Sequence, residues 1–152
     1  MLEPSFDVAR KHIEDTLASL GVDPAKVRVK DAASEVSWSL KRGSASVLVS
    51  LQAGDESART GGRLRIAASV MIAPAEPVKR AALYERLLEL NASLLNAAFA
   101  IVGDRVIAVS ERPTAGLDPT EVAQALKHLS AVADTYDDRL VAEFGGKRAS
   151  DA

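Results

Sequence analysis

The sequence predicts an α+β fold in which a mainly antiparallel sheet packs against helices, in the order α-β-β-β-α-β-β-α. Three observations predict it. Apolar residues recur at helical spacing near both ends of the chain and again in its middle. Between these stretches, apolar and polar residues alternate with a period of two, which is typical of strands with one buried face. Short turns join consecutive strands, which favours antiparallel pairing.

The first helix is expected over residues 6–20. Ser5 is a favourable N-cap residue and Gly21 is a favourable residue for ending a helix, so the two delimit the segment. Asp23-Pro24 predicts a turn after it. The apolar face of this helix consists of Phe6, Ala9, Ile13, Leu17 and Leu20.

Four alternating stretches follow, at residues 27–30, 36–40, 47–51 and 64–72, and the first is the shortest. Arg42-Gly43-Ser44 predicts a tight hairpin. The glycine-rich loop 54–62 leads into a strand and lacks the Gly-Lys-Ser/Thr ending of a phosphate-binding loop, so we expect a hairpin connection there. The positions expected to face the core are Val36, Trp38, Leu40, Val47, Val49, Leu51, Leu64, Ile66 and Val70.

A second helix is expected from Pro77 to about Ala98. It carries two adjoining apolar stripes, although the surface helix of a monomer needs only one. One stripe contains Leu83, Leu87, Leu90, Leu94 and Ala97, and the other contains Tyr84, Leu88, Leu95 and Ala98.

Two strands around the Gly103-Asp104 turn, residues 99–102 and 106–109, are apolar on both faces and are expected in the middle of the sheet. Asp118 predicts the start of a third helix, with Pro119 at its first position and Glu121 completing a capping box. We expect one domain over residues 1–145 and a flexible tail over residues 146–152. The apolar stripe of the third helix consists of Val122, Leu126, Leu129, Ala133, Tyr136, Leu140 and Phe144, before Gly145.

Composition excludes several classes of protein. The 152 residues are 47% hydrophobic and 26% charged, with no cysteine and two histidines, which is typical of a globular chain and excludes disulfide and thiolate-metal sites. A net charge of -2 and 4% aromatic residues argue against nucleic-acid binding. The N-terminal residues do not resemble a signal peptide, and no apolar run is long enough for a membrane helix, so a cytoplasmic protein without membrane contact is expected.

Candidate catalytic and metal-binding residues are few. Asp134 and Asp138, with Asp137 beside them, could bind Mg²⁺, but carboxylates opposite an apolar stripe more often form a solvated helix surface. His12 and His128 lie on different predicted helices without converging partners. We therefore predict no catalytic residue, no metal site and no cofactor. Asn91 and Asn96, within the second predicted helix, are interpreted as structural.

The segment Leu87–Phe144 resembles a known family. It combines a helix containing Leu-Asn, an apolar strand, a Gly-Asp turn, a second strand, a Leu-Asp cap and a last helix containing Ala-Asp. This order resembles the YbjN family of bacterial proteins and the class I chaperones of bacterial type III secretion, which share a fold. The resemblance implies a secretion-chaperone-like sandwich, often a homodimer, that binds proteins and is not an enzyme.

Three functional hypotheses follow. The first is a non-enzymatic protein-binding module with a chaperone-like or regulatory role. The second is a dedicated type III secretion chaperone for one exported protein. The third, a small enzyme, would need a polar pocket with perturbed ionisable groups, and no residue pattern indicates one. Residues 26–65 contain eight basic and four acidic side chains, which leaves open a preference for an acidic protein partner.

Two surfaces are predicted from the residue pattern. The second stripe of the middle helix, with Tyr84, Leu88 and Leu95, is expected to form a homodimer interface, because a long exposed apolar stripe is unfavourable in a monomer. The outward face of the sheet is the candidate peptide site, unless it is merely solvated or covered by the dimer partner. Its predicted contact residues are Leu48, Arg65 and Met71, among the smaller outward residues Ser37, Ser39, Ser50, Ala67 and Ser69.

Overall fold

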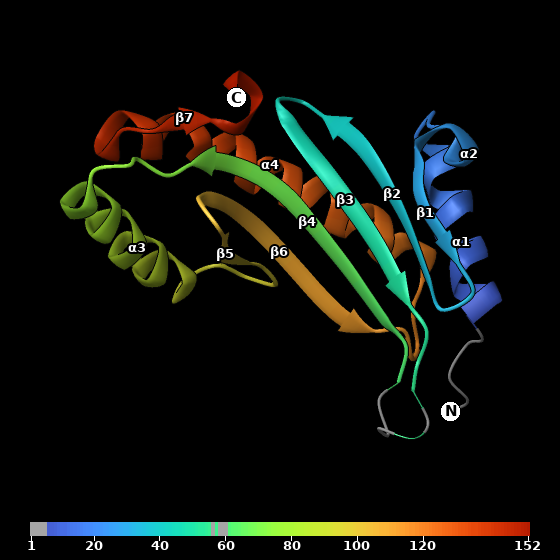
Figure 1. Ribbon diagram of the computed structural model, residues 1–152. Coiled ribbons are helices and arrows are strands. Elements are labelled where there is room, and N and C mark those ends of the chain that lie inside the picture. Colours follow the sequence, from blue (N-terminus) through green and yellow to red (C-terminus); the bar gives the residue numbers. More distant parts are fainter. Residues whose placement is uncertain (1–5, 56, 58–60) are drawn as a thin grey trace. The chain divides into compact units, whose positions relative to one another are not determined.

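A computed structural model describes residues 6–55, 57 and 61–152, and the predicted cap Ser5 lies outside these residues. The helices and strands follow the predicted order, with short additions (Figure 1). The helices are α1 (Phe6–Ser19), α2 (Pro24–Val27), α3 (Pro77–Asn91), α4 (Pro119–Phe144) and the 3₁₀ helix η1 (Ala149–Asp151). The strands are β1 (Arg28–Ala32), β2 (Glu35–Arg42), β3 (Ala45–Gln52), β4 (Arg63–Ile72), β5 (Ala98–Val102), β6 (Arg105–Pro113) and β7 (Lys147–Arg148).

The seven strands of the described residues form one sheet in the order β1-β2-β3-β4-β6-β5, with β7 paired to β4. The pairs β1–β2, β5–β6 and β4–β7 are antiparallel. Gly103-Asp104 makes the predicted turn, since Val102 pairs with Arg105 across it. The α+β class and the mainly antiparallel sheet are therefore confirmed, but β5 lies at an edge rather than in the middle.

Contacts divide the chain into two compact units, and β2, β3, β4, β6 and α4 contribute residues to both. The first unit contains Met1–Leu40, Leu48–Ile66 and Glu111–Lys127. The second unit contains Lys41–Val47, Ala67–Ser110 and His128–Ala152.

The first unit buries the apolar face of α1 together with alternate residues of the strands. Gly21, at a φ of +80°, ends α1 as predicted, because its N–H binds the carbonyl of Ala18 while that of Val22 binds the carbonyl of Leu17. Asp23-Pro24 begins the short helix α2 rather than a simple turn, and the Asp23 carboxylate accepts the N–H of Ala25. The buried apolar residues here include Ala9, Ile13, Leu17, Val36, Trp38, Leu40, Val49, Leu51, Leu64, Ile66, Val122 and Leu126.

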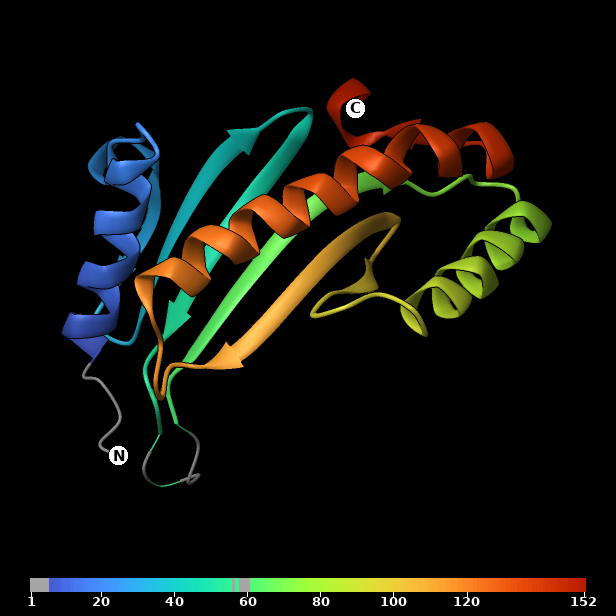
Figure 2. The same cartoon turned by 180° about the vertical axis from the view of Figure 1, so that it is seen from behind.

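The second unit contains α3, the β5–β6 hairpin and most of α4 (Figure 2). Phe99 of β5 is buried and meets Tyr136 of α4 edge-on, with ring centroids 5.4 Å apart. The other buried apolar residues include Val47, Ala68, Val70, Leu83, Leu87, Val106, Ala108, Leu129, Ala133 and Leu140. Val122, Leu126, Leu129, Ala133 and Leu140 of the predicted α4 stripe are buried, whereas Tyr136 and Phe144 are partly exposed. All nine predicted core positions of the strands are buried.

The middle helix ends earlier than predicted, at Asn91 rather than near Ala98. The Asn91 side-chain oxygen accepts the N–H of Phe99 (2.7 Å), and its amide nitrogen donates to the Phe99 carbonyl (3.1 Å). These two bonds hold the start of β5 beside the end of α3, so the chain leaves the helix. The structural interpretation of Asn91 is confirmed. Asn96 has a φ of +52°, a left-handed conformation that a helix does not contain.

Residues 147–151, which lie in the segment expected to be a flexible tail, form the short elements β7 and η1. Lys147 and Arg148 pair with Ile72 and Met71 of β4. Glu121 also departs from the prediction: Asp118 caps α4 by accepting the N–H of Thr120 (2.7 Å), but the Glu121 carboxylate pairs with Arg112 instead of completing a capping box.

The acidic side of α4 is not uniformly solvated. Asp137 is 6% exposed and accepts the hydroxyl of Ser44 (3.0 Å), while Asp134 accepts the same hydroxyl at 2.6 Å. The two carboxylates therefore hold the β2–β3 hairpin against the helix. Among the described residues, no group of three or more acidic, histidine or cysteine side chains could hold a metal ion.

We predict that Leu129→Ala and Asp137→Ala both lower the free energy of unfolding, measured by urea denaturation. Leu129 is fully buried, and truncating such a leucine costs about 2–5 kcal/mol. Asp137→Ala removes a charged hydrogen-bond acceptor and should cost about 1–3 kcal/mol. Glu143→Ala, at an exposed position of the same helix, is the control and should change little. An unchanged free energy for Asp137→Ala would show that the Ser44 contact contributes nothing.

We also predict an acid-dependent loss of stability at the start of α3. The N–H groups of Val78 and then Lys79, which bind the Glu76 carboxylate at 2.9 and 2.8 Å, lower the pKa of Glu76. Because this folded-state pKa is depressed, the stabilisation is present above the unfolded pKa and is lost as the pH falls through the folded pKa. Melting temperatures between about pH 6 and about pH 3 should therefore fall less for Glu76→Gln than for the wild type. Equal falls would contradict this role of Glu76.

Candidate functional site

The outward face of the sheet in the first unit is a polar surface joined from strand to strand. The hydroxyl oxygens of Ser37 (β2) and Ser50 (β3) are 3.2 Å apart. Between β3 and β4, the guanidinium of Arg63 donates to the side-chain oxygen of Gln52 at 2.6 Å. Arg65 pairs with Glu111 of β6 at 3.3 Å. These contacts confirm that alternate residues of β2, β3 and β4 share the face opposite the core.

Leu48 is the exposed large apolar residue of this surface, with 41% of its area accessible. It lies on β3 between the serines at positions 46 and 50. Arg65, the second residue predicted to contact a peptide, is partly exposed and bound to Glu111. Leu48 and Arg65 thus lie on the outward side of the first unit, where low side chains surround one apolar residue. Such a surface can receive an extended chain that inserts an apolar side chain beside Leu48.

Met71, the third predicted contact residue, does not lie on an accessible face. It belongs to the second unit and is fully buried. Its backbone pairs with Arg148 of β7, so the segment that was expected to be flexible occupies the adjacent strand position. Ser37, another outward residue, is also buried, with 4% exposed. Alternation identifies which face a side chain takes, but it does not reveal what else packs on that face.

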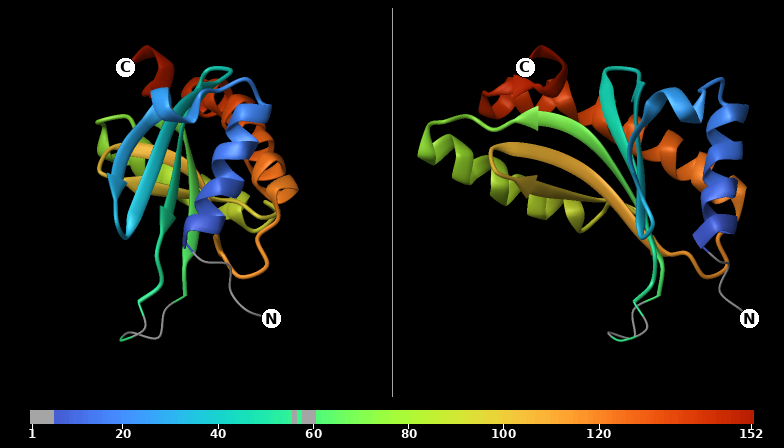
Figure 3. Two further views of the ribbon diagram at one scale, coloured as in Figure 1. Left: turned by 90° about the vertical axis from the view of Figure 1, so that its right-hand side faces the viewer. Right: turned by 45° about the vertical axis from the view of Figure 1, so that its right-hand side comes forward.

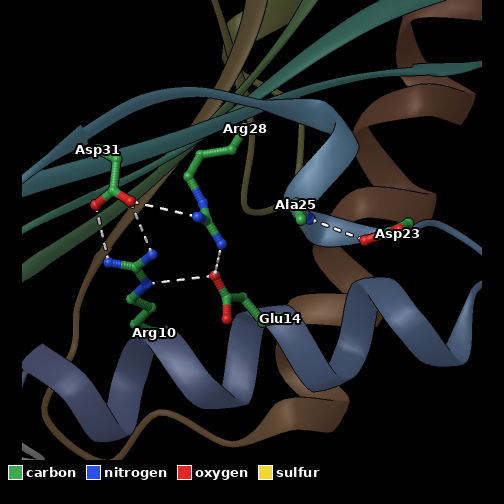
Figure 4. A network of polar contacts seen from close by, with 6 residues as sticks. All are labelled: Arg10, Glu14, Asp23, Ala25, Arg28 and Asp31. Atoms are coloured by element: carbon green, nitrogen blue, oxygen red, sulfur yellow. Dashed lines mark hydrogen bonds and ion pairs between the residues drawn. The ribbon is translucent and has the colours of Figure 1, made fainter.

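A second polar network fastens the edge strand β1 to α1 (Figure 4). Arg10 binds both oxygens of Asp31 at 3.0 and 3.2 Å, and Arg28 binds Glu14 at 2.9 Å. The hydrogen bond from Arg10 is the main cause that lowers the pKa of Asp31, and it raises the pKa of Arg10. Because the network pairs two cations with two anions, it carries no net charge. Its contacts hold β1 against α1. Figure 3 shows α1 and β1 side by side.

The predicted interface residues in the second unit remain exposed in this chain. Leu88 on α3 is 71% exposed and Leu95 is 74% exposed, while Tyr84 is partly exposed. Leu95 lies beyond the end of α3, so the three residues do not form one helical stripe. The edge strand β5, which contacts α3, adds exposed apolar side chains at Ile101 (43%) and Val102 (58%). Ile101 and Val102 are not among the predicted interface residues, because their strand was expected in the middle of the sheet.

The two histidines have separate surroundings. His128 Nε2 lies 2.7 Å from the carbonyl oxygen of Leu95, a backbone contact that positions the segment after α3. His12 is half-buried on α1 in the first unit. The glycine-rich loop 54–62 connects β3 to β4, as expected, and residues 56 and 58–60 lie outside the described part of the chain. No helix among the described residues is both long and apolar enough to span a membrane.

The sequence matches the family described as "T3SS (YopN, CesT) and YbjN peptide-binding chaperone 1" over residues 7–152. A comparison with curated proteins finds no match. Because the match covers nearly the whole chain, it includes both units and both predicted surfaces.

Solved structures show the same fold. A chain of the ExsC–ExsE complex aligns with a TM-score of 0.56 at 16% identity, covering 91% of this chain and 97% of that one. A chain of the heterodimeric ExoU–SpcU complex from the type III secretion system of Pseudomonas aeruginosa gives 0.53 at 17% identity, covering 87% and 97%. The HopA1–SchA chaperone–effector complex gives 0.53 at 15% identity, covering 85% and 92%.

These likenesses agree with the resemblance seen in the segment Leu87–Phe144 and with the observed α+β architecture. Chaperones bind other proteins without chemically transforming them, so the non-enzymatic expectation agrees with the family. The chain belongs to the family of peptide-binding chaperones that unites YbjN with the type III secretion chaperones, and is a chaperone-like protein-binding module rather than an enzyme.

Proposed function

We propose that this protein binds an extended segment of a protein partner on the outward face of β3 and β4 in the first unit. The observation that carries the proposal is the exposure of Leu48 on a face otherwise formed by serine, glutamine and arginine side chains. Small side chains such as those of Ser39 and Ser50 project little from the sheet, so an extended backbone can approach this face. Leu48 supplies the apolar contact.

The charged residues of this surface favour one type of partner segment over another. Lys30 pairs with Glu35 and Arg65 pairs with Glu111, so these cations are neutralised by carboxylates. Arg63 instead donates to the uncharged amide of Gln52. A partner with a carboxylate near Arg63 would form the charge-assisted bond that the amide does not. This supports an acidic rather than a basic segment at this place.

The relatives suggest one setting for such binding. The HopA1–SchA structure is a chaperone–effector complex, and the ExoU–SpcU complex comes from a type III secretion system. Our second hypothesis is accordingly a dedicated secretion chaperone that holds one exported protein in the bacterial cytoplasm. A regulatory YbjN-like module would instead retain its partner inside the cell. The identity of the captured protein distinguishes the two.

We predict that Leu48→Ser reduces the recovery of partner proteins when the tagged chain is used for affinity capture from its own host cells. The substitution removes exposed apolar area and should leave the melting temperature close to that of the wild type. Val78→Ser, at a residue 75% exposed on α3, is the matched control and should keep full recovery. Equal recovery of the same proteins by folded Leu48→Ser would exclude this face as the binding site.

We further propose a homodimer through the exposed apolar residues of α3, the segment after it and β5. Leu88, Leu95, Ile101 and Val102 are each at least 43% exposed within one unit. Apolar surface of this kind is commonly covered by a second chain. β5 is also an edge strand, so a second copy could cover unpaired backbone as well as side chains.

Light scattering at micromolar concentration should give twice the chain mass of 16.0 kDa. Leu88→Asp should shift the mass to that of the monomer while the circular dichroism spectrum stays that of the wild type. Arg86→Ala, at an exposed position of α3 outside the apolar stripes, should leave the dimer intact. A wild-type mass of 16.0 kDa would exclude the dimer.

A further inference from the structure

The last strand of the chain completes a sheet position that would otherwise be open. β7 lies antiparallel to the end of β4, with Lys147 opposite Ile72 and Arg148 opposite Met71 (Figure 1). β3 begins at Ala45, and the N–H of Ser46 donates to the hydroxyl of Ser69 at 3.0 Å. β4 therefore continues beyond the start of β3, and β7 pairs with the residues that β3 does not reach.

The other side of β4 is already occupied at this level. The N–H of Ala73 donates to the carbonyl of Asp104 in the β5–β6 turn at 2.7 Å. Without β7, the backbone of Met71 and Ile72 would form a short open edge. Unpaired strand edges attract extended chains, because each N–H and C=O group there needs a partner.

β7 is held in place by few interactions. It consists of two residues, and it follows Gly145 and Gly146, at φ values of +87° and +85°. Glycine loses more conformational entropy on folding than any other residue, so ordering this connection is unfavourable. Arg148 pairs with Asp138 at 3.3 Å and Asp151 at 2.9 Å, but all three side chains are more than a third exposed. Exposed ion pairs stabilise by little, so these two pairs contribute little to holding β7 against β4.

We propose that the end of β4 is a strand-addition site that residues 147–148 occupy in the isolated chain, and that an extended basic segment of a partner takes their place. The inference deepens the proposed protein-binding function and rests on it. The backbone of Met71, which the sequence places on the outward face, is thus paired with a residue of the same chain.

The chemistry of the displaced strand defines its replacement. Arg148 lies between two carboxylates, and Asp138, which stays on α4 when β7 leaves, is 73% exposed. Asp134 and Asp137 lie on the same helix, although both already accept the Ser44 hydroxyl. An incoming strand therefore needs an arginine or lysine where Arg148 now stands, with main-chain hydrogen bonds to β4 supplying the remaining interaction.

Gly146 provides a way to open the site in the full-length chain. A Cβ atom on Gly146 would lie 2.2 Å from the carbonyl oxygen of Ile72, which is too close, and the positive φ is unfavourable for any other residue. Gly146→Ala should therefore release β7 while α4 stays folded. Gly116→Ala is the matched control, since Gly116 also has a positive φ but no atom within 4 Å of the added Cβ.

The experiment titrates each full-length variant with a synthetic peptide of residues 146–152 to millimolar concentrations, following the backbone amide resonances of Met71 and Ile72. In the wild type, β7 competes with the peptide for the end of β4 at an effective concentration of roughly millimolar. Because Gly146→Ala removes this competitor, it should bind the peptide about tenfold or more tightly than the wild type or Gly116→Ala does. The R148E peptide should not bind. Equal binding of the peptide to Gly146→Ala and Gly116→Ala, or equal binding of both peptides, would overturn the proposal.

A second variant and a second measurement serve if Gly146→Ala does not fold. Arg148→Glu introduces repulsion from Asp138 without a clash, and it should bind the wild-type peptide like Gly146→Ala. In the wild-type chain, the amide hydrogens of residues 146–148 should exchange at least about tenfold faster than those of β6. Exchange as slow as that of β6 would overturn the proposal, because the strand would then leave only on global unfolding. Neither measurement involves Leu48. A negative result would therefore overturn strand addition at the end of β4 without bearing on the proposed binding face at Leu48.

Discussion

The one-sided burial of β3 and β4 is the constraint on which the structure depends. Val49 and Leu51 of β3 are fully buried, whereas the alternating Ser50 and Gln52 face outward. A shift of one residue in pairing would bury the polar set and expose the apolar one. The contacts Ser37–Ser50, Gln52–Arg63 and Arg65–Glu111 are formed in this register. The same constraint therefore determines both the core and the candidate binding face.

Most of the fold could be predicted because its signals are local. Period-two alternation located β2, β3 and β4, and Gly21, Gly103 and Asp118 each marked a turn or a helix end correctly. The predictions differ from the structure where an element ends or forms because of a contact with residues distant in sequence. Asn91 ends α3 by binding the backbone of Phe99, and β7 forms because β4 extends past β3. Neither partner can be inferred from the neighbouring residues.

The candidate site could be predicted in part. Leu48 and Arg65 lie where alternation places them, on the outward side of the first unit. Met71 follows the same alternation but is buried, because exposure depends on what packs above a strand as well as on its own period. Ile101 and Val102 were missed for the opposite reason: an apolar sequence suggested an inner strand, whereas β5 lies at an edge. An edge strand that is apolar on both faces is itself a signal for a binding surface.

The family match indicates what kind of protein this is, and the outward face of β3 and β4 is where we propose that it acts. Site-specific photo-crosslinking tests that central claim most directly. A photoreactive amino acid replaces Leu48 in one variant and Val78 in another, and both are irradiated in host cells. We expect a covalent adduct with a partner protein at position 48 and none at position 78. No adduct at position 48, with the variant folded and the partner still captured, would contradict it.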